Sequence, residues 1–339
     1  TLQTGERYTI WQSSFLGHTF DVVDKKTNEL LHSHTVMHHT HVVVGHDHHA
    51  KDYNRSVQNT FDFDGVSRKV KQAMSSEWDK SNGVTRTFTP LGFSKGKLPK
   101  DVWGSISAYH YNNKDNVFAE EWTKGNKGYF VNWWEVKPYM IGIPWNLKRY
   151  WQTRMRDMVA KWIGGEIPLE NTDIYGIRRY EDGARLLSHV DRESTHAVSM
   201  IVNIDQVQMR EPWMVEIYDF AGRLHEVEMA PGDVVYYESA KALHGRMQPL
   251  KGASYSNMFT HYRPAGDPKW STRPNPENTP AQVLSIDHCK KVDGVLDCDG
   301  VKLPFLSPSK EVVKGRHDLF NYWERITETI KKSPRVGEL

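Results

Sequence analysis

Two histidines and one aspartate are the residues whose types and spacing best suit metal chemistry in this chain: His189, Asp191 and His244. In an extended strand, residues i and i+2 point to the same side, so His189 and Asp191 can reach one ion. His244 must then come from a second strand lying alongside. Two imidazoles and one carboxylate can occupy one face of Fe(II) and leave the opposite face open. The spacing therefore predicts a three-ligand iron site with vacant coordination positions.

The residues around these three extend the pattern well beyond a His-x-Asp tripeptide, which chance alone produces in a chain with 17 histidines. They are Tyr180, Gly183, Arg192, the Pro231-Gly232-Asp233 turn, Gly245, Arg246 and Gly252. Over roughly residues 170–264 the sequence resembles the prolyl-4-hydroxylase-like branch of the Fe(II)/2-oxoglutarate dioxygenases. The resemblance implies that His189, Asp191 and His244 bind Fe(II), with 2-oxoglutarate and O2 as co-substrates. It also implies that Tyr180 points into the co-substrate pocket.

The usual anchor for the far carboxylate of 2-oxoglutarate is missing from its expected place. Members of this family usually carry Arg or Lys nine or ten residues after the distal histidine, where this chain has Ala253 and Ser254. A buried carboxylate needs a cation or several hydrogen-bond donors. Either the anion is held from elsewhere in the chain, or the pocket accepts a different partner.

Two arginines are the main candidates for the missing anchor. Arg178 shares the inward face of its strand with Tyr180, and Arg246 lies two residues after His244 on the metal-facing side. Either arginine can instead be a surface ion-pair residue. Lys251 has the right charge but lies in the loop before the last strand. Hydrogen-bond donors are also available from Asn203, Ser254 and Ser256.

The substrate is less clearly indicated. Peptide-modifying members of the family have the sequence Gly-Gly-Glu-Thr on the strand where this chain has Trp213, Glu216 and Tyr218. They also usually retain the basic residue that anchors 2-oxoglutarate. A small amino-acid-derived substrate therefore fits better than a prolyl peptide. The sequence is similar to those of algal members of the branch, including kainoid synthases, which close a ring on N-prenylated glutamate derivatives. Arg192 is a candidate for binding a substrate carboxylate; alternatively, it forms an ion pair with a neighbouring acidic residue.

Three functions therefore compete. The first is an oxygenase that attacks an unactivated C–H bond of a small amino-acid-like molecule, by oxidative cyclisation or by hydroxylation. The second is a peptidyl-prolyl 4-hydroxylase. The third is a non-catalytic jelly roll that keeps a metal for structure, which the missing anchor favours. A structural metal prefers a closed four-ligand site, so the three-ligand set favours an enzyme.

Composition excludes some partners and leaves the compartment open. Lys and Arg number 44 against 42 Asp and Glu, and a net charge of +2 gives no sign of nucleic-acid binding. No apolar run approaches eighteen residues, so we expect no membrane span. The chain begins at Thr1, so a leader segment can have been removed. We expect a soluble protein of the cytoplasm or an organelle lumen, of undetermined oligomeric state.

Eight short β-rich segments separated by turn residues occupy residues 172–264. This spacing predicts a mainly β fold with flanking helices, built on an antiparallel jelly roll, also called a double-stranded β-helix. The expected strands are Ile174–Tyr180, Arg185–His189, His196–Ile204, Trp213–Asp219, Leu224–Met229, Val234–Glu238, His244–Met247 and Ser254–Tyr262.

Helices are expected on both sides of this β-rich region. Apolar residues at spacings of three and four predict a helix from Pro144 to Trp162, stopped by Gly164-Gly165, and another over Asp318–Lys332. Val66–Trp78 is a weaker helical candidate. We divide the chain into an α/β extension (1–140), the oxygenase core with its supporting helix (141–264), and a C-terminal extension with a hairpin and a helix (265–339).

Two features outside the core have open interpretations. Asp293-Gly294 is a strong hairpin turn signal, and a hairpin centred there sets Cys289 opposite Cys298 at a separation that suits a disulfide. The alternative is two free thiols. Nine histidines fall between His18 and His49 without a recognisable ligand spacing. Surface histidines are the expected explanation, and a second metal site or a pH-sensitive patch is the alternative.

Overall fold

The computed structural model describes residues 19–23, 26–27, 30–35, 63–120, 136–282, 290–293, 295–298, 301–303 and 308–332. The chain separates into two compact units, Thr1–Thr60 and Phe61–Leu339. In the first unit, β1 (Thr19–Val23) and β2 (Leu30–Thr35) form an antiparallel pair. Most of the histidine-rich segment lies outside the described residues. The three-part division of the chain stays a prediction.

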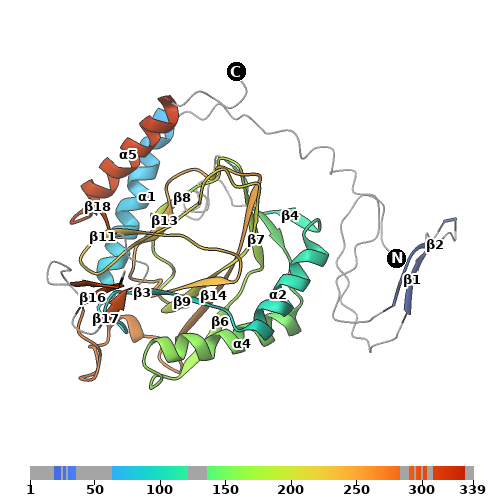
Figure 1. The fold of residues 1–339 in the computed structure, drawn as a ribbon, viewed down its shortest axis with the longest axis horizontal. Coiled ribbons are helices and arrows are strands. Elements are labelled where there is room, and N and C mark those ends of the chain that lie inside the picture. Colours follow the sequence, from blue (N-terminus) through green and yellow to red (C-terminus); the bar gives the residue numbers. More distant parts are fainter. Residues whose placement is uncertain are drawn as a thin grey trace. The chain divides into compact units, whose positions relative to one another are not determined.

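Two antiparallel sheets make up most of the second unit (Figure 1). The five-stranded sheet has the order β18 (Pro308–Val312), β11 (Arg223–Val227), β10 (Val215–Tyr218), β13 (His244–Arg246) and β8 (Leu186–His189). The larger sheet has the order β3 (Phe93–Lys97), β12 (Asp233–Tyr237), β9 (Val198–Val207), β14 (Ser254–Pro264), β7 (Ile177–Glu181), β5 (Tyr139–Ile141) and β4 (Val117–Ala119), with β6 (Leu169–Asp173) also paired to β14.

The chain crosses between the two sheets in the manner of a jelly roll. Strands β7, β9, β12 and β14 belong to the larger sheet, whereas β8, β10, β11 and β13 belong to the smaller one. Each of the eight predicted strand segments overlaps one of these eight strands, with ends that differ by up to three residues, so the predicted mainly β jelly-roll fold is confirmed. Apolar side chains from both sheets meet between them, among them Ile201, Ile217 and Val235.

Helices flank both sheets. The helices α1 (Phe63–Gly83) and α5 (Arg316–Lys332) contact each other, and α1 contacts β8 (Figure 1). Their buried side chains, including Met74 and Trp323, form one apolar cluster with Leu187 and Val190. The helices α2 (Lys100–Asn113) and α4 (Trp145–Trp162) contact the larger sheet. The helices predicted near residues 66–78, 144–162 and 318–332 are all confirmed.

A small three-stranded sheet lies outside the jelly roll. It consists of β15 (Lys290–Val292), β16 (Val295–Cys298) and β17 (Val301–Leu303). Val292 pairs with Val295, and Asp293 in the turn has a φ of 49°, so the predicted hairpin is confirmed. Cys289 lies outside the described residues, and its disulfide with Cys298 stays a prediction.

Among the described residues, no helix combines the length and the apolar character needed to cross a membrane.

Candidate metal centre and cavity

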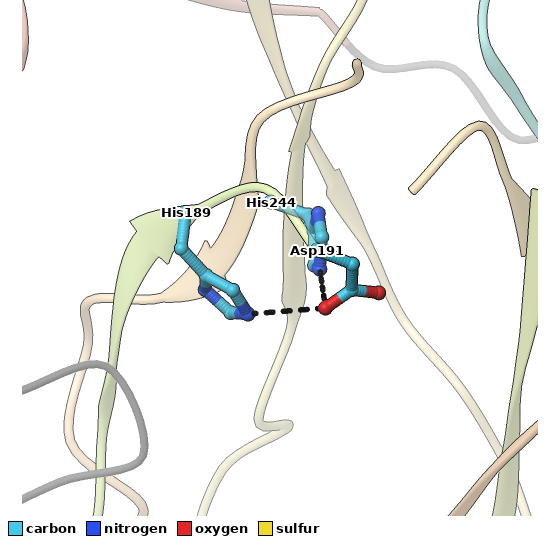
Figure 2. A group of neighbouring side chains, drawn as sticks. All are labelled: His189, Asp191 and His244. Atoms are coloured by element: carbon cyan, nitrogen blue, oxygen red, sulfur yellow. Dashed lines mark ion pairs between the residues drawn. The ribbon is translucent and has the colours of Figure 1, made fainter. Parts of the chain in front are cut away.

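The three predicted ligand residues meet at one point between the sheets (Figure 2). The Oδ1 atom of Asp191 lies 4.0 Å from His189 Nε2 and 3.9 Å from His244 Nε2. One ligand atom from each residue falls within 4.8 Å of the others, which is the spacing of a group able to hold a metal ion. Two nitrogen donors and one oxygen donor suit Fe(II), so the residues present fit the ion that the sequence pattern predicts.

A β-bulge in β8 gives His189 its direction. His244 pairs with His189 but Arg246 pairs with Leu186, so β8 contains one residue more than β13 over this stretch. Leu186 and His189 therefore both line the cavity, whereas Leu187 packs into the cluster under α1 and α5. Bulges of this kind re-aim a side chain and increase local twist.

Asp191 is not held in the way that strand alternation predicts. Strand β8 ends at His189, so Asp191 lies beyond the regular strand. The Asp191 backbone N–H instead donates to the Ser239 carbonyl at 2.8 Å. The Tyr237 hydroxyl donates to Asp191 Oδ2 at 3.3 Å, and His261 Nδ1 lies 3.7 Å from the same oxygen. These contacts fix Oδ2 and leave Oδ1 facing the two ligand imidazoles.

Backbone carbonyls fix the tautomer of both ligand histidines. His189 Nδ1 lies 2.7 Å from the Leu187 carbonyl, and His244 Nδ1 lies 2.9 Å from the Ala242 carbonyl. A carbonyl oxygen can only accept, so each Nδ1 must carry the proton and donate it. Each Nε2 therefore keeps its lone pair for a metal, as in most protein sites that bind metals through histidine.

The charge states also suit a metal. Burial lowers the pKa of His244 to about 4, helped by His189 and opposed by Asp191, so this imidazole is neutral near pH 7. Burial alone would raise the pKa of the Asp191 carboxyl. The neighbouring imidazoles, His244 foremost, instead hold that pKa well below its usual range. Asp191 thus offers an anionic oxygen and His244 an unprotonated nitrogen without first releasing a proton.

A cavity of about 440 Å³ opens from this centre between the two sheets. Its lining includes the three ligand residues together with Glu77, Glu120, Tyr175, Arg178, Tyr180, Arg192, His196, Arg246 and His261. Tyr180 is 1% exposed and lines the cavity, in the position that the sequence pattern indicates. This volume is typical of a pocket for a small ligand.

The two candidate anchor arginines differ in their partners. The Arg178 Nη2 atom lies 2.5 Å from Glu120 Oε1, so this guanidinium already has a counter-ion. Arg246 is 4% exposed, its guanidinium lies 4.2 Å from the Trp213 ring centre and 4.6 Å from that of Tyr255, and Nη1 donates to the Trp213 carbonyl. Among the described residues, no carboxylate pairs with Arg246.

The remaining predicted site residues are less central. Arg192 is exposed and lines the cavity, and no described acid forms an ion pair with it. Asn203 is buried but bonds to the Ser256 carbonyl and to Gln206, and it is not among the cavity residues. Ser254 at the start of β14 is also outside the lining. Lys251 pairs with Glu211 at the surface.

Several cavity residues were not assigned a role from the sequence, among them His261, Tyr175 and Glu77. His261 accompanies Phe259 on one face of β14, so strand alternation within the predicted Ser254–Tyr262 segment could have indicated it. The His261 and His196 rings lie 3.7 Å apart between centres, and the Tyr175 hydroxyl lies 3.3 Å from His196 Nε2. Burial lowers the pKa of both histidines, which favours neutral rings on this wall.

Solved structures with a similar chain path were found, all at low identity. A prolyl-4-hydroxylase from Pseudomonas putida is 14% identical, with 57% of this chain and 100% of that chain covered and a TM-score of 0.40. A prolyl hydroxylase from Trichoplax adhaerens, in complex with a hypoxia inducible factor peptide fragment, is 11% identical, with coverages of 61% and 96% and a TM-score of 0.41. HygX from Streptomyces hygroscopicus, with nickel, 2-oxoglutarate and hygromycin B bound, is 13% identical, with coverages of 52% and 84% and a TM-score of 0.37.

No protein-family model matches the sequence, and the search of curated proteins gave no match. The functional conclusion therefore rests on the side chains of this chain.

Proposed function

We propose that this protein is a non-haem Fe(II)/2-oxoglutarate-dependent oxygenase that acts on an unactivated C–H bond of a small amino-acid-derived substrate. Fe(II) would be held by His189, Asp191 and His244. When bound, the iron with 2-oxoglutarate and O2 supplies the oxidising power for either hydroxylation or oxidative cyclisation. The chain's own residues position the reactants and keep water away from them.

The observation that carries the proposal is that one cavity contains both a group of metal-ligand side chains and a buried arginine. The three ligand residues can bind the cation. Arg246 can bind the anion, because its guanidinium is buried and has no carboxylate partner in the part of the chain that the structure describes, which is costly until an anion joins it. An iron ion and the far carboxylate of 2-oxoglutarate would satisfy both.

Arg246 is therefore the proposed anchor of the co-substrate, in place of the basic residue that the family usually carries further along. An arginine can hold a carboxylate through two parallel hydrogen bonds. The Trp213 and Tyr255 rings on the guanidinium restrict its position before the anion arrives. Tyr180, which packs edge-on against Trp213, lines the same cavity and would complete the pocket. Arg178 is the second candidate, and its pairing with Glu120 argues against it.

The substrate side of the proposal rests on the cavity volume and on Arg192. About 440 Å³ for co-substrate and substrate together favours a small molecule over a folded or extended peptide. Arg192 at the exposed edge of the lining, with the Tyr175 hydroxyl, would receive a substrate carboxylate. A molecule with more than one carboxylate, such as an N-prenylated glutamate, fits these charges.

Turnover of 2-oxoglutarate tests the proposal. Purified protein supplied with Fe(II), 2-oxoglutarate and O2 should release succinate, and the rate should rise with the accepted substrate. An N-prenylated glutamate and a prolyl peptide are the two substrates to compare. His189→Ala should abolish succinate formation, whereas His317→Ala, at an exposed position of α5, should leave it unchanged.

Three results would overturn parts of this proposal. Succinate formation that persists in His189→Ala would exclude the iron centre. Coupled turnover with the prolyl peptide alone would make the protein a peptidyl-prolyl 4-hydroxylase. No binding of 2-oxoglutarate to the Fe(II)-loaded protein would favour a non-catalytic metal-binding jelly roll.

A further inference from the structure

A carboxylate from a distant helix contacts the backbone between two of the metal ligands. Glu77 lies on α1 and is 2% exposed. Its Oε2 atom accepts a hydrogen bond from the Val190 N–H at 3.2 Å, across 113 positions of sequence. Val190 is the middle residue of the His189–Asp191 segment, so α1 takes part in the metal centre without supplying a ligand.

The Val190 amide needs such a partner because of where β8 ends. The strand ladder stops at His189, so regular sheet hydrogen bonding does not continue through the ligand segment. The next amide, that of Asp191, donates to the Ser239 carbonyl. Two consecutive amides are thus tied to two different parts of the fold, one to α1 and the other to the segment that follows β12. Together these bonds fix how far Asp191 lies from His189.

The rest of α1 supports this contact. The Val190 side chain is buried in the cluster that α1 and α5 form on β8. One turn along the helix, Lys80 Nζ lies 3.0 and 3.1 Å from the two Glu77 carboxylate oxygens. This ammonium is partly exposed and balances the charge of the buried carboxylate.

We propose that Glu77 is a positioning residue of the metal centre, acting through the Val190 amide to set the geometry and hence the affinity of the three ligands. The inference rests on the metal centre of the proposed function. Glu77 itself is not one of the three grouped ligand residues. Groups that orient metal ligands through hydrogen bonds commonly change metal affinity about 10-fold to 100-fold when they are removed.

Two variants of similar size separate hydrogen bonding from packing. Glu77→Gln keeps an oxygen that can accept from Val190, whereas Glu77→Met fills the space without any acceptor. The probe is Co(II), whose visible absorption reports ligand geometry, titrated into metal-free protein under nitrogen. We expect Glu77→Met to weaken Co(II) binding by about 10-fold to 100-fold and to alter the spectrum. Glu77→Gln should recover most of the affinity and the spectrum of the unmodified protein.

A matched control distinguishes docking of α1 from the contact with Val190. Lys71 on α1 pairs with Glu324 on α5 at a partly exposed position. Lys71→Gln should leave Co(II) affinity unchanged, even if it lowers the melting temperature slightly. A loss in Lys71→Gln equal to that in Glu77→Met would overturn the proposal, because general helix docking would then explain both.

Two further outcomes would also overturn it. One is a folded Glu77→Met protein that binds Co(II) with unchanged affinity and spectrum. The other is loss of cooperative melting in both Glu77 variants, since Glu77 would then be a folding residue. If the unmodified protein binds no Co(II), the proposed function fails, and that result is distinct from failure of the Glu77 proposal alone.

Discussion

The two functional ends of the cavity are built in different ways. At the metal end, each ligand histidine is oriented by the carbonyl two residues before it, Leu187 for His189 and Ala242 for His244. At the arginine end, Arg246 is held by the carbonyl of Trp213, 33 positions away, and by the Trp213 and Tyr255 rings. The two ligand histidines are therefore oriented by local backbone, whereas Asp191 is held from more distant segments. The arginine end depends on strands brought together by the fold.

The two ends also differ in how their binding groups affect the stability of the ligand-free protein. The metal end exposes lone pairs, which water can solvate before a metal arrives. The arginine end keeps a charge buried at 4% exposure without a carboxylate among the described residues, so it should lower the stability of the ligand-free protein. Binding of an anion there should raise the melting temperature, because a ligand that binds only the folded state stabilises it.

The largest effect is expected at Gly245, which lies between His244 and Arg246 and so belongs to both ends. A Cβ added there would lie 2.8 Å from the Leu187 carbonyl oxygen and 2.9 Å from Ser188 N, at the bulge of β8. Gly245→Ala must push β13 away from β8. We expect more than 100-fold loss of succinate formation and a loss of about 1–3 kcal/mol in unfolding free energy, measured by turnover assays and urea denaturation.

Gly104→Ala provides the control for Gly245→Ala. Gly104 is exposed on α2, and a Cβ there meets nothing within 4 Å. The alanine should stabilise the protein by about 0.5–1 kcal/mol through helix preference. Normal activity in Gly245→Ala would show that the close approach of β13 to β8 is not needed to align the ligands.

Arg246→Gln should separate the two ends. Removing one partner of a buried charge pair costs about 2–5 kcal/mol, so the KM for 2-oxoglutarate should rise about 30-fold or more. Co(II) affinity in the absence of 2-oxoglutarate should stay within about threefold, since no metal-ligand contact is lost. The measurements are initial rates against 2-oxoglutarate concentration and a Co(II) titration.

Arg178→Gln is the comparison that sharpens this result. Arg178 already has Glu120 as its counter-ion, so its loss should raise the KM for 2-oxoglutarate less than Arg246→Gln does. A larger rise for Arg178→Gln than for Arg246→Gln would reverse the assignment of the anchor.

These contrasts explain which parts of the site the sequence could predict. The metal ligands lie in short segments with a recognisable spacing, so the sequence could group His189 with Asp191, although strand alternation beyond the end of β8 does not hold Asp191. The choice between Arg178 and Arg246 was left open because it depends on Glu120, which comes from outside the predicted core. Glu77 carried no signal, since its contact with Val190 joins segments 113 positions apart.

The fold divides in the same way. All eight jelly-roll strands and three helices were predicted, because alternation and helical periodicity are properties of a short segment. Strand β3, with the sequence Phe-Ser-Lys-Gly-Lys, lacks such alternation and was not predicted. It forms because β12 offers it an edge, with Tyr237 paired to Phe93. Likewise, the bulge in β8 depends on its partner β13 and could not be inferred from β8 alone.

A buried carboxylate supports the arginine end and should make stability depend on pH. Glu216 accepts the N–H of Met247, next to Arg246, at 3.0 Å, and the Tyr322 hydroxyl at 3.1 Å. Burial raises the pKa of Glu216 from 4.5 to about 7, against these hydrogen bonds. Between these pH values the unfolded chain has lost the proton while the folded protein retains it. Unfolding free energy should therefore fall as the pH rises from about 4.5 to about 7.

Glu216→Gln tests this dependence, with urea denaturation at several pH values. Glu238, whose pKa burial also raises to about 7, lies away from the arginine end, where it accepts the Phe88 and Thr89 amides. The glutamine at 216 should remove roughly half of the decrease that the two carboxyls cause, and leave the rest to Glu238. A slope unchanged by Glu216→Gln would mean that Glu216 is ionised throughout this range.

The smallest effect is expected from the side-chain hydrogen bond that the Asp191 carboxylate accepts from Tyr237 at the metal end. The Tyr237 hydroxyl donates to Asp191 Oδ2 at 3.3 Å, a long bond, and His261 lies beside the same oxygen. Tyr237→Phe keeps the ring against His244 and removes only this donor. A net loss of about 0.5–1.5 kcal/mol corresponds to a Co(II) affinity about 2-fold to 10-fold weaker, measurable by titration. If the loss reached that of Glu77→Met, orientation of the metal end would depend on distant strands as much as the arginine end does, and the contrast between the two ends would be wrong.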